Sequence, residues 1–167
     1  MYCTIQDIRG IISDETLIQL VDDSGSGLSM SAVASVAAGA DPTALGLDAA
    51  QAAEAPVAVA AFVEIIANAC GTVDGFSAGR YVIPWSPVPS LIKSIVLDIA
   101  VYNLYSRREN VPPLRTERHA NAMKLLDRLA KGTLTIGSSQ NPQPTVGGAA
   151  VYRSRAKIFD AAKLDTF

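Results

Sequence analysis

The stretch SLIKSIVLDIAVYNLYSRRENVPPLRTERHANAMKLLDRLAKG, residues 90–132, decides the fold. Its first part, residues 90–108, predicts a helix that is apolar on almost every side, which is typical of a helix in a protein core. The Pro112-Pro113 pair stops this helix because proline lacks a backbone donor and restricts the preceding residue. Residues 114–131 then carry apolar side chains at helical spacing on one face only. The stretch therefore predicts a helical hairpin.

Upstream of the hairpin, capping signals predict three shorter helices. Thr4 is placed to cap the first helix, and Asp7 completes a capping box with it. Ser13 is expected to cap the second helix, in which leucines and a valine recur at helical spacing. Either Ser29 or Ser31 begins the third, alanine-rich helix. Together these signals predict a helical N-terminal region.

Glycine and proline interrupt the chain between the third helix and the hairpin. GADPTALGLD, residues 39–48, breaks helical continuity. A longer helix is expected from Pro56 to Gly71, with Pro56 in its first turn. GTVDGFSAGRYVIPWSPVP, residues 71–89, reads as a long surface loop with one extended segment, because glycines and prolines flank a short aromatic stretch.

The C-terminal part of the chain differs in composition from the rest. Gly132 is expected to cap the last helix, and TLTI, residues 133–136, predicts a short strand. Residues 137–148 are rich in Ser, Pro, Gln and Gly, which predicts a flexible arm. We therefore predict an all-α fold: a small bundle of about four to six helices over residues 1–136. A flexible arm with an apolar, basic anchor follows over residues 137–167.

Composition fits a single domain of ordinary size. The chain has 167 residues, of which 49% are hydrophobic and 18% charged. Its two cysteines, Cys3 and Cys70, lack metal-ligand spacing, so we expect free thiols and a reducing compartment. No signal peptide is predicted at the N-terminus. The longest apolar run, residues 55–63, is shorter than the roughly 20 residues of a membrane span, so no membrane partner is expected.

Charge is distributed unevenly along the chain. Residues 1–74 hold one basic residue, Arg9, against ten acidic ones, whereas residues 75–167 hold thirteen basic against six acidic ones. A molecule polarised in this way can meet copies of itself head to tail, acidic side against basic side. Chance clustering of like charges is the alternative interpretation.

The search for chemistry gives no catalytic, metal or cofactor residues. The single histidine, His119, lies in an amphipathic helix without a flanking motif, so a structural role is expected. The glycines of DSGSG, residues 23–27, are not followed by the Lys-Ser/Thr of a phosphate-binding loop. Cysteines and histidines lack zinc spacing, and the calcium-loop pattern is missing. We therefore expect a protein that is not an enzyme.

The densest functional signal is the basic region 102–131, which holds seven basic residues against three acidic ones. Nucleic-acid binding is one hypothesis for this region, although no known DNA- or RNA-binding motif surrounds it. Tyr102 and Tyr105 belong to the apolar helix and are expected largely in the core. Arg107 and Arg108 suit the negative end of that helix, and arginine also pairs with carboxylates at interfaces.

Several blocks, in this order, resemble the Mu-like phage neck proteins, a family of head–tail connector or adaptor subunits. The blocks are MYCTIQDIRGIISDETLIQLVDDSGSG, then VDGFSAGRYVIPWSPVPSLIKSIVLDIAVYNLYSRR, then VPPLRTERHANAMKLLDRLAKGTLTI. They cover about two thirds of the chain. Residues 40–55 depart from the pattern and look like an insertion, either a longer loop or an extra helix.

The resemblance implies a virion structural protein that acts by assembly. Members of that family form a ring, usually of twelve subunits, beneath the portal, where the ring extends the DNA channel and receives the next neck or tail component. DNA then passes without sequence-specific binding, and the protein is made in the bacterial host cytoplasm and resides in the virion neck. In related adaptors a flexible C-terminal segment reaches toward the portal or a neighbouring subunit.

The resemblance implies that a neighbouring subunit supplies the carboxylate partners of the arginines, and whether Arg107, Arg108, Arg115 and Arg118 reach that neighbour stays open. Whether the C-terminal arm docks on its own chain or on a neighbour stays open. The residues expected at the interface with other subunits or the portal are Arg80, Tyr81, Trp85, Arg107, Arg108, Arg115, Arg118, Tyr152, Arg153, Arg155, Phe159 and Phe167.

Overall fold

Six α-helices and one 3₁₀ helix make up the computed structural model, which describes residues 1–136. Over this range there is no strand, so the predicted all-α class and helix number are confirmed. The predicted arm and anchor, residues 137–167, lie outside the described residues. The elements are α1 (Ile5–Arg9), α2 (Asp14–Val21), α3 (Met30–Ala37), η1 (Pro42–Leu45), α4 (Ala49–Ser77), α5 (Ser90–Ser106) and α6 (Pro113–Lys131).

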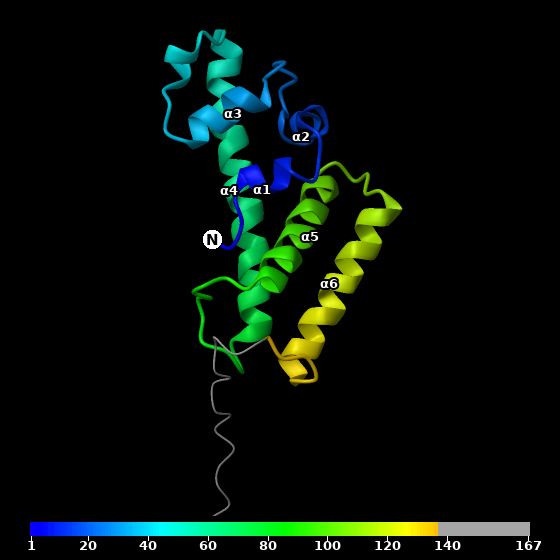
Figure 1. Ribbon diagram of the computed structural model, residues 1–167. Coiled ribbons are helices and arrows are strands. Elements are labelled where there is room, and N and C mark those ends of the chain that lie inside the picture. The colour runs from blue at the N-terminus through cyan, green and yellow to red at the C-terminus, as the bar shows by residue number, and fades with distance from the viewer. Residues whose placement is uncertain (137–167) are drawn as a thin grey trace, which may run out of the picture.

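The long helix α4 is the centre of the arrangement. Figure 1 shows α4, α5 and α6 side by side, with α5 in the middle, and α1, α2, α3 and η1 gathered around one half of α4. The buried face of α4 repeats at helical spacing through Ala58, Phe62, Ile66, Ala69 and Val73. Several of these side chains are small, so neighbouring backbones can approach closely. The predicted hairpin of two helices corresponds to α5 and α6.

Most helix ends lie where the capping signals predicted them. The backbone N–H of Asp7 donates to Thr4 Oγ1 at 3.3 Å, and the N–H of Thr4 donates to Asp7 Oδ2 at 2.9 Å, which completes the capping box of α1. Ser13 and Ser29 cap α2 and α3 through the same kind of side-chain contact. Gly132 ends α6 with φ 74°, in the left-handed region that favours glycine. Local chemistry therefore fixes these boundaries.

The N-terminal half of α4 differs from the prediction. The helix begins at Ala49 instead of Pro56, because Asp48 and Gln51 form a second capping box. Pro56 therefore lies in the helix interior, on the exposed side, where water can reach the carbonyl left without its helical donor. The presumed insertion, residues 40–55, forms η1 and the first turns of α4.

The C-terminal half of α4 also differs, since the predicted surface loop at residues 71–77 is helical. Val73 and Ser77 are fully buried there, so continued packing offsets the cost of the helical glycines Gly71 and Gly75. The irregular loop begins only after Ser77 and contains cis peptide bonds before Pro84 and Pro87.

The predicted strand at residues 133–136 is wrong. The backbone N–H groups of Thr133 and Leu134 both donate to the carbonyl of Arg128, at 3.0 Å and 3.2 Å. These donors satisfy the open carbonyl at the end of α6, so they are not available for a strand ladder.

α4 is long and apolar enough to cross a membrane by length and composition, and it is the single helix of this kind among residues 1–136. One such helix is weak evidence for a membrane segment, because the central helix of a helical bundle has the same composition. Phe62, Ile66 and Val73 of α4 are buried against other helices of the bundle. Its outer face, however, is richer in apolar side chains than a solvated helix face usually is.

The backbone conformation of three glycines predicts the sign of the stability change when each is replaced. Gly71 and Gly75 are helical, whereas Gly132 ends a helix. Gly71→Ala and Gly75→Ala should each raise the free energy of unfolding by about 0.5–1 kcal/mol, because an added Cβ meets nothing within 4 Å and alanine favours a helix. Gly132→Ala should lower it by about 1–2 kcal/mol, because its φ of 74° strains any residue with a Cβ.

Urea denaturation of the three variants beside the parent protein gives these values. A loop at residues 71–77 would instead make Gly71→Ala and Gly75→Ala neutral or destabilising.

Candidate interaction surface

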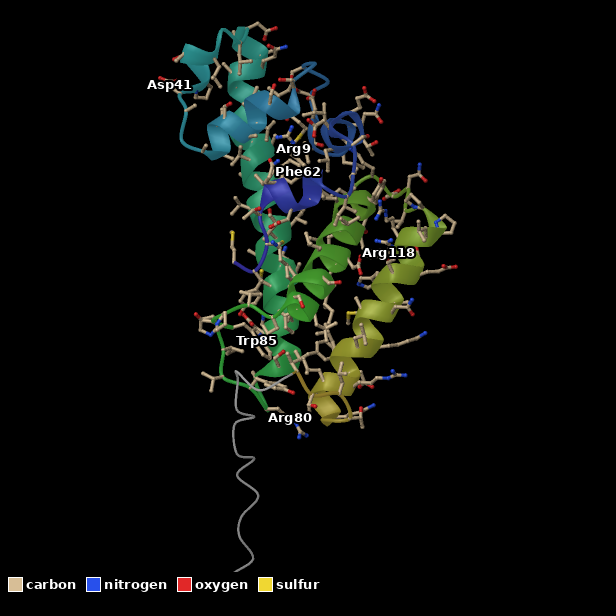
Figure 2. All side chains as sticks on the ribbon, in the orientation of Figure 1. Arg9, Asp41, Phe62, Arg80, Trp85 and Arg118 are labelled. Carbon is tan, nitrogen blue, oxygen red and sulfur yellow. The ribbon has the colours of Figure 1, made fainter. Side chains whose placement is uncertain are left out.

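The expected interface residues that the structure describes lie at two opposite ends of α5. Arg80, Tyr81 and Trp85 belong to the loop before α5, whereas the arginines from Arg107 to Arg118 surround the turn after it. Figure 2 shows Arg80 and Trp85 at one end of the bundle and Arg118 toward the other. The 17 residues of α5 separate the two groups by about 25 Å. The expected residues Tyr152, Arg153, Arg155, Phe159 and Phe167 lie outside the described residues.

Arg107 and Arg108 bind the C-terminal end of α2. Arg107 Nη1 donates to the Leu20 carbonyl at 3.0 Å, and Arg108 Nη2 donates to the Asp22 carbonyl at 3.0 Å. Both guanidinium groups also pair with the Asp23 carboxylate at 2.8 Å. These carbonyls lack helical donors and carry the negative end of the helix dipole, so two cations stabilise them. The arginines therefore cap α2 rather than their own helix.

The Asp22 side chain organises the loop that presents these acceptors. Its carboxylate accepts backbone N–H bonds from Ser26 at 3.1 Å and Gly27 at 3.0 Å, and a hydroxyl bond from Ser24 at 3.1 Å. Burial works to raise the pKa of the Asp22 carboxyl, but these hydrogen bonds outweigh it and hold that pKa below its usual range. DSGSG is thus an ordered loop built around an aspartate.

These contacts bear on the interface expected from the sequence. Within the chain, Arg107 and Arg108 already meet the carboxylate of Asp23, and their contact with a neighbouring subunit stays a prediction. All three side chains keep at least 30% of their surface exposed, so the ion pairs themselves contribute little in water. The hydrogen bonds to backbone carbonyls make the larger contribution.

At the other end of the bundle, Arg80 closes the C-terminus of α6. Arg80 Nη1 donates to the Lys131 carbonyl at 3.2 Å, and its guanidinium occupies the space beside Gly132 that a Cβ would need. Tyr81 and Trp85 are each only 2% exposed, and their rings pack with centroids 4.9 Å apart. These two aromatic side chains therefore belong to the core and present no surface to a partner.

An N-terminal anchor beside this loop was not predicted from the sequence. The Tyr2 hydroxyl donates to Asp74 Oδ1 at 2.5 Å and accepts the backbone N–H of Trp85 at 3.3 Å. Burial, together with the bond to Asp74, raises the pKa of Tyr2 to about 12. This hydroxyl joins the first residues of the chain to α4 and to the loop before α5.

The outer face of α6 carries the basic side chains that remain available. Arg118 lies 3.8 Å from Asp98 of α5, and Lys131 pairs with Asp127 at 2.7 Å. Arg115, Lys124 and Arg128 have no side-chain partner within the described part of the chain, and the last two are exposed. α4, by contrast, carries Glu54, Glu64 and Asp74 and no basic residue.

His119 has a structural position, as expected. Its ring stacks on Tyr102 with centroids 4.0 Å apart, and burial lowers the pKa of the imidazole. Tyr102 and Tyr105 are half-buried, which is less than the largely internal position predicted for them. No group of three metal-ligating side chains occurs among residues 1–136.

The lowered pKa of His119 predicts a stability change near neutral pH. The unfolded chain binds this proton more tightly than the folded chain does. The contribution of His119 to the free energy of unfolding should therefore be complete above the ordinary pKa of 6.5. It should decrease as pH falls toward 5.5. His119→Phe can keep the stack on Tyr102 but cannot titrate, so its decrease should be smaller. Urea denaturation at pH 7.5, 6.5 and 5.5 measures both proteins, and equal decreases would contradict the prediction.

The contacts of Arg107 predict a difference between two arginines of the same region. Arg107→Ala should lower the free energy of unfolding by about 1 kcal/mol, because the Leu20 carbonyl of α2 and the Asp23 carboxylate lose a charged donor. Arg115→Ala is the matched control and should stay within about 0.5 kcal/mol of the parent. Equal effects of the two substitutions in thermal or urea unfolding would exclude the capping role.

One family of known proteins matches the chain by sequence. The sequence profile of the family described as Bacteriophage Mu, Gp36 matches residues 2–153. No curated protein matches the chain. Since the match covers nearly the whole chain, the resemblance to Mu-like phage proteins is confirmed. The chain therefore belongs to the bacteriophage Mu Gp36 family, which makes it a phage structural or morphogenesis protein.

Proposed function

We propose that the protein is a head–tail connector subunit that assembles into a ring beneath the portal. In this role it extends the DNA channel and receives the next neck or tail component, without catalysis. The ring number of twelve comes from the resemblance to phage neck proteins. The virion neck is the corresponding location.

The observation that carries the proposal is the division of charge between α4 and α6. Both helices pack against α5 and against each other, and each also keeps an exposed side (Figure 1). α4 has acidic residues only, whereas α6 has five basic residues against two acidic ones. The exposed side of α4 on one copy and the exposed side of α6 on the next can form a head-to-tail contact, which closes into a ring when the rotation permits.

Nucleic-acid binding through residues 102–131 is the competing prediction. Four of the seven basic side chains in this region, Arg107, Arg108, Arg118 and Lys131, already pair with carboxylates of the same chain. Those side chains are less available for phosphate contacts, which dominate the affinity of nucleic-acid-binding proteins. Lys124 and Arg128 take part in none of these pairs and are exposed, so they are available to an acidic protein surface.

Native mass spectrometry of the protein with the portal of the same phage tests the proposal. We expect ring-sized oligomers on the portal that dissociate as salt is raised. The double variant Lys124→Glu/Arg128→Glu should reduce assembly at least tenfold while keeping the parent's helicity. Adding Glu64→Lys to that variant restores opposite charge across the contact and should recover part of the assembly.

Either of two outcomes would exclude the proposal. One is that only monomers are detected with the portal present at low salt. The other is tight binding of duplex DNA or RNA in a gel shift that weakens steeply with salt and is lost in the double variant, without any assembly on the portal.

A further inference from the structure

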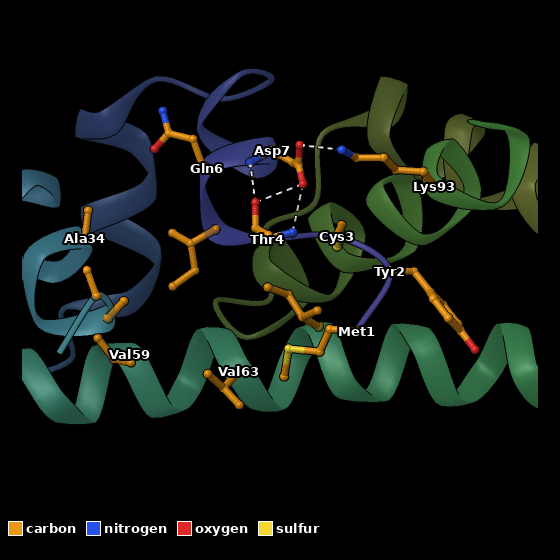
Figure 3. A pocket seen from close by; sticks show the side chains of 14 residues that line it. Met1, Tyr2, Cys3, Thr4, Gln6, Asp7, Ala34, Val59, Val63 and Lys93 are labelled. Atoms are coloured by element: carbon orange, nitrogen blue, oxygen red, sulfur yellow. Dashed lines mark hydrogen bonds and ion pairs between the residues drawn. The ribbon is translucent and has the colours of Figure 1, made fainter. Parts of the chain in front are cut away.

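An apolar groove runs between the N-terminal segment, α3 and α4. Its volume is about 490 Å³, which lies within the roughly 300–1,000 Å³ of ligand-sized clefts. Figure 3 shows Met1 and Cys3 above α4, Val59 and Val63 below them, and Ala34 of α3 at the side. The Asp7–Lys93 ion pair, at 2.7 Å, is the charged contact at the rim. The groove therefore offers mainly apolar surface.

The groove continues into an exposed apolar face of α4. Val63 keeps 42% of its surface exposed and Val57 keeps 53%, while Met1 above the groove keeps 71%. Ala53, Ala60 and Ala67 are exposed at helical spacing along the same helix. Exposed apolar side chains beside an apolar groove are typical of a surface that a further contact covers.

We propose that residues 152–167 of the same chain dock into this groove. That segment is the part of the chain outside the structure that has large apolar side chains close together. They are Tyr152, Ile158, Phe159, Leu164 and Phe167. Aromatic and aliphatic side chains gain the most from leaving water for an apolar groove. The inference concerns the isolated chain, in which no neighbouring subunit occupies α4, and it does not depend on the proposed connector role.

The charges of the two surfaces are complementary. Among residues 152–167, four basic side chains accompany two acidic ones, and α4 carries three acidic residues and no basic one. Glu64 lies beside Val63 and is exposed, so it can meet a basic side chain next to the docked apolar ones.

The length of the connecting chain favours docking on the same molecule. The contact between Arg80 and the Lys131 carbonyl places the end of α6 beside the end of α4. From Ser77, Val63 is fourteen residues back along α4, or about 21 Å. The fifteen residues 137–151 reach at most about 50 Å, and a Gly- and Ser-rich chain of that length spans about 20 Å on average. A connector matched to its span gives an effective concentration near the millimolar range.

Disulfide trapping in the full-length chain tests the proposal. In dilute protein, Val63→Cys/Phe159→Cys should form an intramolecular bridge under mild oxidation. The matched control is Gly75→Cys/Phe159→Cys. Gly75 is exposed on the same helix and nearer to its C-terminal end, so mere proximity to the connector would favour it. Docking predicts at least tenfold more bridge at residue 63 than at residue 75.

The native thiols add little background to this experiment. Cys3 and Cys70 are buried and free, and burial raises the pKa of the Cys3 thiol to about 12. Cysteine reactivity depends on the thiolate, so Cys3 should stay inert under mild oxidation, and burial restricts the access of reagents to Cys70. The parent protein measures what remains, and circular dichroism verifies that each variant is helical.

A second measurement keeps the proposal testable if the bridge geometry is poor. The single variant Val63→Cys should react with a maleimide reagent at least threefold faster once Phe159→Ser and Phe167→Ser are added. Gly75→Cys should react at the same rate in both backgrounds. Equal bridging at residues 63 and 75, bridging between molecules only, or an unchanged reaction rate at Val63→Cys would each overturn docking on the same chain.

Discussion

Burial of one face of α4 is the constraint on which the rest of the fold depends. Phe62 is fully buried, and the alanines before and after it let α3, α5 and α6 approach the α4 backbone. α1 has five residues and α3 has eight, lengths at which an isolated helix is not stable in water. These short helices persist because they cover α4 or the helix beside it. The N-terminal anchor through Tyr2 and Asp74 adds a polar contact to the same helix.

Sequence reasoning predicted the features that local chemistry determines. Thr4, Ser13 and Gly132 mark helix ends because their own side chain or backbone freedom satisfies the end of a helix. The length of α4 could not be obtained in this way. A proline inside a helix costs about 3 kcal/mol and a glycine about 1 kcal/mol, whereas burying a large apolar side chain gains about 1.5–3 kcal/mol. Phe62 and Val73 pack against elements that are distant in the sequence, and this packing determines the length of α4.

The same distinction between local and distant contacts explains why the positions of the expected interface residues could not be read from the sequence. The arginine-rich turn was recognised from composition, but its partners are Leu20 and Asp23, more than 80 residues away in the chain. Asp22 and Asp23, at the start of the DSGSG loop, are adjacent in the sequence, yet nothing in the spacing connects them to this turn. Tyr81 and Trp85 were placed at a surface because glycines and prolines surround them. Their large apolar rings instead pack into the core, since the loop folds back over the N-terminal segment.

α4 is held at both ends by residues distant in sequence. Near its start, Gln51 Nε2 donates to the carbonyls of Ser26 and Gly27 at 3.4 Å and 3.3 Å. Toward its end, Asp74 accepts from Tyr2. A helix of 29 residues is about 43 Å long. A tilt of about 5° at one end would displace the other end by about 4 Å over that length. Contacts near both ends oppose such a tilt, so they fix the position of the loop that carries Arg80 relative to the α2–α3 side of the bundle.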